Sequence, residues 1–165
     1  MSRLDSFIRR LEAQRACLDW AAQQVAARPG IVLELGLGNG RTYDHLRDRL
    51  PDHAILAFDR QLAAHPDCIP AADHLLLGDF RDTLPDLAGR LTAPIVLVHA
   101  DTGSGDLEAT AALAAWLGPA LAPLLSPGAL VLSDQRLAIP GATLLPLPPK
   151  VPPGRYFIYR AGRGM

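Results

Sequence analysis

Four acidic residues and one histidine stand where short apolar runs of this sequence give way to polar residues. Glu34 lies near the end of the first run, Asp59 and Asp79 follow the second and third, and His99 and Asp101 follow the fourth. A histidine can take up a proton near neutral pH, and a neighbouring carboxylate can orient it or a substrate. His99 and Asp101 are therefore the predicted catalytic residues.

Three glycines at alternate positions separate the first apolar run from an amphipathic segment that stops at Pro51. They are Gly36, Gly38 and Gly40. This order predicts a buried strand, a tight turn and a helix. Glycine adopts positive φ without strain and leaves no side chain between the turn and a ligand. Open α/β sheets bind their ligands at such loops, beyond the carboxyl ends of the strands.

The elements that must position these residues alternate along the chain. Apolar runs at residues 31–35, 54–58, 75–77, 95–98 and 129–132 are separated by helical or loop segments. Short apolar runs in this arrangement predict a parallel sheet that is covered on both faces. Because the carboxyl ends of parallel strands share one edge of the sheet, we expect the polar residues to gather there.

The C-terminal part of the sequence predicts a different connection. Only eight residues, 135–142, separate the fifth run from residues 143–145, which is too short for a helical crossover. A further strand is predicted at residues 155–159, so these two segments form an antiparallel hairpin. The predicted fold is a three-layer α/β sandwich, with a mostly parallel seven-stranded Rossmann-like sheet and an antiparallel C-terminal hairpin.

Length and composition predict one domain over residues 1–165, with an N-terminal helix within residues 1–29 packed on it. The formal net charge of -1 argues against a nucleic-acid partner. Two cysteines and a highly charged N-terminus fit a cytoplasmic protein. Residues 109–133 carry no charge, but their prolines and glycines predict a helix followed by a strand rather than a membrane span.

The N-terminal helix carries an apolar stripe, and its start is predicted to be capped by Ser2 and Asp5. Apolar residues also repeat there every seven positions, at Leu4, Leu11, Leu18 and Val25. Such a repeat is compatible with a homodimer or a higher homo-oligomer through this helix. Packing within the molecule is the simpler interpretation, and we favour it.

Two ligand classes compete for the glycine turn. Dinucleotide sites use GxGxxG, whereas the spacing here is one residue shorter, and no GK[ST] of a P-loop follows. The segment ELGLGNG resembles motif I of class I S-adenosylmethionine (SAM)-dependent methyltransferases. The resemblance extends through LAFDR, LLGDF, LVHAD and SPGALVLSD. It is supported by the intervals of 25, 20 and 22 residues between Glu34, Asp59, Asp79 and Asp101. More narrowly, the chain resembles a small bacterial family of SAM methyltransferases.

The resemblance implies SAM as cofactor and assigns roles to the strand-end residues. Asp59 would bind both ribose hydroxyls, Asp79 and Phe80 would contact the adenine, and Arg60 would lie over its edge or remain a surface charge. The three glycines would pass beneath the cofactor. Glu34 would anchor the methionine amino group or the loop itself. The methionine carboxylate would meet three residues of the turn: Asn39, Arg41 and Thr42.

The resemblance also implies methyl transfer to an acceptor, which we expect to be a small molecule. Two alternatives remain at this point: a non-catalytic SAM-binding regulatory module and a nicotinamide-dependent oxidoreductase. We predict no metal. A looser alternative, similar to catechol-type methyltransferases, would place Mg²⁺ on His99 or Asp101 together with Asp134 and Gln135.

Overall fold

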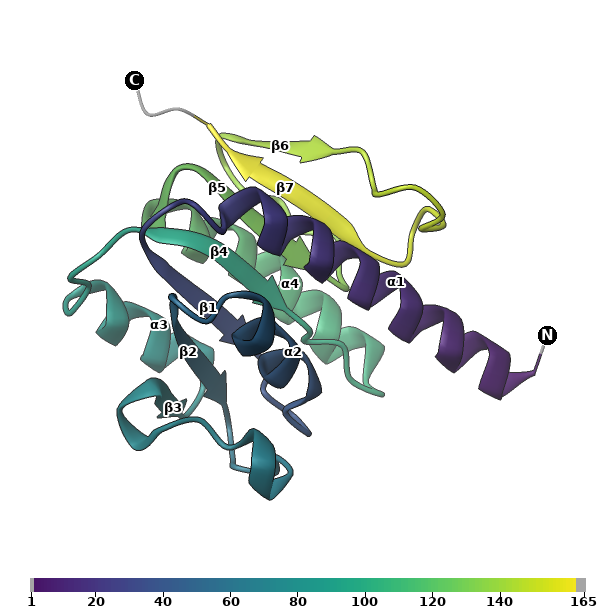
Figure 1. Ribbon diagram of the computed structural model, residues 1–165, viewed down its shortest axis with the longest axis horizontal. Helices are drawn as coiled ribbons and strands as arrows, with labels where there is room; N and C mark the ends of the chain where they lie inside the picture. Colours follow the sequence, from purple (N-terminus) through teal and green to yellow (C-terminus); the bar gives the residue numbers. More distant parts are fainter. Residues whose placement is uncertain (1, 163–165) are drawn as a thin grey trace.

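The computed structural model describes residues 2–162, which form one seven-stranded sheet with helices on both faces (Figure 1). The strand order is β3-β2-β1-β4-β5-β7-β6. The parallel strands are β1 (Ile31–Leu35), β2 (Ala54–Asp59), β3 (Leu75–Leu77), β4 (Ile95–Ala100) and β5 (Leu125–Ser133). The last two, β6 (Ala142–Leu145) and β7 (Phe157–Ala161), form the antiparallel end of the sheet. The predicted fold class is thus confirmed.

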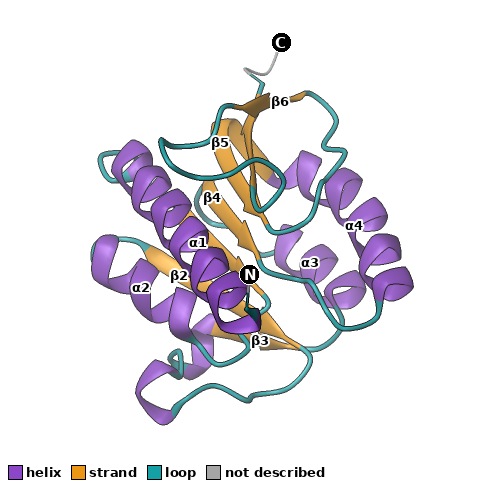
Figure 2. Cartoon of the chain, turned by 90° about the vertical axis from the view of Figure 1, so that its right-hand side faces the viewer, coloured by secondary structure: helices purple, strands orange, loops and turns teal. Residues whose placement is uncertain are grey.

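The helices form the outer two layers of the sandwich (Figure 2). Helices α1 (Arg3–Val25) and α2 (Arg41–Arg49) cover one face, and α3 (Phe80–Ala88) and α4 (Leu107–Leu121) cover the other. Strand β1 supplies both cores, because Val32 packs towards α1 and α2 while Leu33 and Leu35 pack towards α3 and α4. Short 3₁₀ turns lie at Pro66–Cys68, Ala72–His74 and Ala122–Leu124.

The C-terminal hairpin has the predicted topology with shifted bounds. Strand β7 pairs with β5 on one side and β6 on the other, so it lies inside the sheet, and β6 forms its edge. No helix connects β5 to β6 in this described part of the chain, as expected from the short spacer. Strand β5 begins four residues earlier than the apolar run, because Leu125 pairs with Ile95 ahead of a register shift at Pro127 and Gly128.

Helix α1 packs on the sheet only with its C-terminal half. Its start carries the predicted capping box of Ser2 and Asp5. Leu18 and Val25 are fully buried, whereas Leu4, Phe7 and Ile8 are 66%, 46% and 44% exposed, and this end projects beyond the sheet (Figure 1). Leu18 and Val25 thus pack inside the protein, and a homo-oligomer through this helix remains a prediction, for which its exposed first half is available.

The segment Leu107–Leu124 is long and apolar enough to cross a membrane when judged by length and composition alone. In the fold, its helix α4 packs on the sheet with Ala114, Leu117 and Leu121, and Gly118 lies against the backbone of Ala138. The apolar composition of α4 is thus partly accounted for by its contact with the core.

Gly118→Ala should destabilise the fold. A Cβ atom at this position would lie 2.3 Å from the carbonyl oxygen of Ala138, so α4 and the loop after β5 would have to separate. We expect a loss of about 1–3 kcal/mol in the free energy of unfolding, measured by urea denaturation. Gly89→Ala is the control, because Gly89 has φ -74° and a Cβ atom there would lie no closer than 3.8 Å to its nearest neighbour, the backbone oxygen of Asp86. Equal stabilities of the two variants would contradict this packing.

Candidate active site

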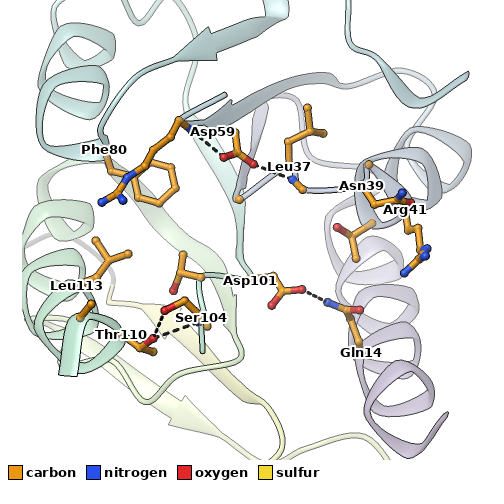
Figure 3. A pocket seen from close by; sticks show the side chains of 18 of the residues that line it. Gln14, Leu37, Asn39, Arg41, Asp59, Phe80, Asp101, Ser104, Thr110 and Leu113 are labelled. Atoms are coloured by element: carbon orange, nitrogen blue, oxygen red, sulfur yellow. Dashed lines mark hydrogen bonds between the residues drawn. The ribbon is translucent and has the colours of Figure 1, made fainter. Parts of the chain in front are cut away.

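A cavity of about 640 Å³ lies at the carboxyl edge of the parallel strands, between the glycine turn, α1 and α4 (Figure 3). Most of the predicted site residues line it: Gly36, Gly38, Asn39, Gly40, Arg41, Thr42, Asp59, Arg60, Asp79, Phe80 and Asp101. Glu34 and His99 do not line it, because both are fully buried behind its wall. The polar strand ends therefore meet at one edge as expected, with two residues one layer deeper.

The glycine turn needs its glycines for two different reasons. Gly36 has φ +91°, and a Cβ atom there would lie 2.3 Å from the backbone oxygen of Asp101. Gly38 has φ +51°, and a Cβ atom there would meet nothing within 4 Å. Gly36 thus allows β1 and β4 to end side by side, whereas Gly38 leaves open space on the cavity side.

Asp59 is held between the turn and its own strand end. One carboxylate oxygen accepts from the backbone N–H of Gly38 at 2.7 Å, and the other from the backbone N–H of Arg60 at 2.7 Å. Each carboxylate oxygen has a second lone pair, so Asp59 can still accept from a pair of hydroxyls in the cavity. This geometry fits the predicted ribose contact, which remains a prediction.

Asp79 has a structural role that is independent of any ligand. It caps the N-terminus of α3 by accepting from the backbone N–H of Arg81 at 2.9 Å. This bond lowers the pKa of Asp79, and the nearby guanidinium groups of Arg81 and Arg60 lower it further. Arg60 lies 3.5 Å from Asp79 and is otherwise exposed, while Phe80 adds an aromatic wall to the cavity. The two predicted adenine contacts are thus available from the first turn of one helix.

Glu34 anchors the glycine turn from below. Thr42, in the first turn of α2, donates its hydroxyl hydrogen to one Glu34 oxygen. The other Glu34 oxygen lies 2.7 Å from Nδ1 of His99. Because the side chain has no exposure and does not line the cavity, the geometry favours the loop-anchoring alternative over contact with a ligand amino group.

His99 does not face the cavity, so the expectation that it is a catalytic base is not supported by its position. Nδ1 contacts Glu34, and Nε2 lies 2.6 Å from the hydroxyl of Tyr156, which is also buried. Burial lowers the pKa of His99, but the Glu34 carboxylate raises it by charge and hydrogen bonding, and the net shift is upward. The sequence placed His99 at the right strand end but could not give the depth of its side chain.

Asp101 is the acidic group that lines the cavity beside the end of β4. Gln14 of α1 donates to it at 2.9 Å (Figure 3). Arg10 of α1 donates to it at 3.1 Å. Gln14 also donates to the Tyr156 hydroxyl at 2.9 Å. Sequence reasoning missed Arg10, Gln14 and Tyr156. A signal was present, since Arg10 and Gln14 are four residues apart and so share one face of α1.

Asp134, part of the magnesium alternative, holds the loop after β4. Its two oxygens accept from the backbone N–H groups of Thr102 at 3.0 Å and Gly103 at 2.9 Å. Gln135 donates to it as well, at 3.0 Å. Within residues 2–162, no group of three or more His, Cys, Asp or Glu side chains is arranged to hold a metal ion.

The stability contributed by His99 should depend on pH. Because the folded-state pKa is raised, the contribution is fully present below the unfolded value near 6.5 and is lost as the pH rises through the folded value. The advantage of the wild type over His99→Asn in urea denaturation should therefore be larger at about pH 5.5 than at about pH 9. In a Glu34→Gln background this difference in stability should depend much less on pH, because the carboxylate that raises the pKa of His99 is gone. An advantage that grows with pH would contradict the assignment.

A family model described as S-adenosyl-L-methionine methyltransferase matches residues 1–161. The solved structure of an S-adenosyl-L-methionine methyl transferase from Silicibacter pomeroyi is 47% identical, with a TM-score of 0.92, and the match covers 98% of this chain and 99% of that one. A search of the curated proteins found no match.

Two more distant structures share the fold. Human Methyltransferase-like protein 13, solved in complex with S-adenosylhomocysteine (SAH), is 14% identical with a TM-score of 0.61, covering 93% of this chain and 82% of that one. The O-methyltransferase TomG from Streptomyces achromogenes, solved in complex with SAM, is 18% identical with a TM-score of 0.55, covering 89% and 79%.

The family match spans nearly the whole chain, and the Silicibacter structure agrees with it over the same length. Both agree with the resemblance carried by the glycine turn and the strand-end acids. They also set aside the nicotinamide alternative. The chain belongs to the S-adenosyl-L-methionine methyltransferase family and is a SAM-dependent methyltransferase.

Proposed function

We propose that this methyltransferase acts on a small molecule that bears a hydroxyl or amine, bound between α1 and α4 against Asp101. The observation that carries the proposal is the division of the cavity into two chemically different halves. The glycine turn, Asp59 and Asp79 line one half. Asp101 and apolar side chains of α1 and α4 line the other.

The first half fits the cofactor. Asp59 retains acceptor capacity for the ribose hydroxyls, Phe80 offers a face for the adenine, and Gly38 leaves room for a ligand beside the turn. Asn39, Arg41 and Thr42 follow the turn at the start of α2, where backbone N–H groups and the helix dipole favour a carboxylate. When bound, SAM supplies a methyl group that its sulfonium has already activated for transfer.

The second half fits the acceptor. Phe7 and Leu11 of α1 and Leu113 of α4 give it apolar walls, and Asp101 is the carboxylate among them. A carboxylate only accepts hydrogen bonds, so it selects an acceptor with an O–H or N–H group. By accepting a hydrogen bond from that group, Asp101 orients the nucleophile. Orientation is the main catalytic task for an in-line displacement.

Other features support a small-molecule enzyme of the cytoplasm formed by a single domain over residues 1–165. The net charge of -1 disfavours nucleic-acid and anionic-membrane partners. Cys17 and Cys68 are free thiols, as expected in a reducing compartment. Homo-oligomerisation, if it uses α1, is restricted to the exposed end around Leu4 and Ile8. Analytical ultracentrifugation would measure whether the protein is a monomer or a homo-oligomer.

Asp59→Ala should abolish SAM binding while the protein stays folded. The carboxylate contacts only the turn and its own strand end, so its loss removes acceptors for the ribose more than it removes packing. We expect affinity for SAM and SAH to fall by at least about tenfold in calorimetric titration, as for loss of a charged hydrogen-bond acceptor. Gly38→Ala should have a similar effect, because its methyl group would project into ligand space. Undiminished SAM binding in both variants would show that the cofactor does not bind beside Asp59 and Gly38.

Asp101→Asn should lower methyl transfer without weakening cofactor binding. The assay is mass-spectrometric detection of SAH with matched phenols, alkylamines and carboxylic acids as acceptors. Turnover should occur with phenols or amines and fall by about 10–100-fold in the variant, because an amide no longer orients the nucleophile as a carboxylate does. Exposed Asp52→Asn is the control. SAM binding with no turnover on any acceptor would favour the non-catalytic module, and turnover on carboxylic acids alone would contradict the assigned acceptor class.

A further inference from the structure

A chain of buried hydrogen bonds runs from behind the cavity wall to Gln14, which lines the cavity, and ends at Asp101. It passes from Glu34 on β1 to His99 on β4, then to Tyr156 just before β7, and then to Gln14 on α1. Gln14 makes the last contact, to Asp101. The members other than Asp101 are 5% exposed or less, so the chain works without solvent.

The chemistry of its neighbours fixes the orientation of Gln14. Asp101 can only accept, so the amide nitrogen of Gln14, not its oxygen, must face Asp101. The same nitrogen lies 2.9 Å from the Tyr156 hydroxyl. Both amide hydrogens are therefore committed, one to each partner. An amide rotated by half a turn would set its oxygen against the carboxylate and lose the bond to Asp101.

Tyr156 is held just as firmly. Its hydroxyl lies 2.6 Å from Nε2 of His99, and the His99 ring is fixed by Glu34, which Thr42 also contacts. Burial raises the pKa of Tyr156 well above its ordinary value, so the phenol stays neutral and keeps its hydrogen. A cationic His99 donates to the phenol oxygen and a neutral one accepts from the hydroxyl, and the phenol contacts Gln14 in both states.

We infer that Gln14 is a positioning residue, which Tyr156 and His99 hold in place so that it fixes the Asp101 carboxylate towards the acceptor. The inference rests on the proposed function, because Asp101 contacts the acceptor there. Arg10 also contacts Asp101 from the same face of α1, but its side chain is 44% exposed, long and flexible. Of the two residues that donate to Asp101, the buried Gln14 is the more rigid.

The alternative is that these bonds only fasten α1 to the sheet. The fastening role and the positioning role differ in what they predict for the hydrogen that Gln14 donates to Asp101 when Tyr156 is replaced by Phe. A fastening role predicts that Tyr156→Phe affects only the amide hydrogen facing Tyr156. A positioning role predicts that both hydrogens are released, because the amide is free to rotate once its buried partner is gone.

The first test follows the Gln14 side-chain amide by NMR in the full-length protein, assigned with Gln14→Met, which fills similar volume without an N–H. Both amide hydrogens should be resolved and protected in the wild type. Tyr156→Phe should speed exchange of both by about tenfold or more, corresponding to loss of one hydrogen bond. Continued protection of the hydrogen that faces Asp101 would overturn the inference. This readout needs neither cofactor nor turnover.

The second test uses methyl transfer to the phenol or amine that gives turnover. Gln14→Met and Tyr156→Phe should each lower kcat by about tenfold, while the SAM dissociation constant changes by less than about twofold. The double variant should be no slower than Gln14→Met alone, because both substitutions break the same line of contact. Arg9→Ala, an exposed change on α1, is the control. Independent losses that multiply to about a hundredfold would overturn the inference.

The two tests separate this inference from the proposed function. If Asp59→Ala loses SAM binding but the Gln14 amide of the wild type is unprotected, the cofactor site is retained and the positioning role is rejected. If the Gln14 amide is protected and responds to Tyr156→Phe, but the enzyme methylates only carboxylic acids, the contact network is retained and the proposed acceptor class is rejected.

Discussion

The carboxyl edge of the sheet is organised by the need to satisfy one buried carboxylate. Glu34 has no exposure and stands in β1, the strand between β2 and β4. Burying a carboxylate costs several kcal/mol unless hydrogen bonds compensate it. Thr42 and His99 provide them. These bonds fix the start of α2 and the end of β4 to β1, which sets the shape of the glycine turn and of the cavity that it lines.

The two halves of the cavity differ in how far apart their residues lie in the sequence. The cofactor half comes from consecutive strand ends, so local order and spacing predict it: glycines, then Asp59, then Asp79. The half that we propose for the acceptor joins distant segments. Gln14 is 87 residues from Asp101 and 142 from Tyr156. Relatives can therefore share the cofactor half while differing in the helix that covers it, and a resemblance in the glycine turn carries no information about the acceptor.

The fold and the part of the cavity lined by the glycine turn and the strand ends could be predicted from the sequence, because both follow from short patterns. Apolar runs gave the strands, and their polar ends gave the edge on which Asp59 and Asp101 lie. The positions of Glu34 and His99 could not be predicted, because alternation along a strand says which face a side chain takes but not whether a helix covers it. Likewise, the stripe on α1 extended to Leu4 and Phe7, although the sheet ends before it can bury them.

Strand β7 follows the other six strands in the sequence, yet it lies between β5 and β6. Until β7 docks, β5 has an open edge with unpaired backbone groups, and such edges invite pairing with other chains. Closing it also brings Tyr156 to His99 and Gln14, across the longest sequence separations in the site. Contacts of this kind carry a large loop-closure entropy and form slowly. Late docking of β7 would thus make the nascent chain most prone to aggregate in the interval just before its acceptor pocket is complete.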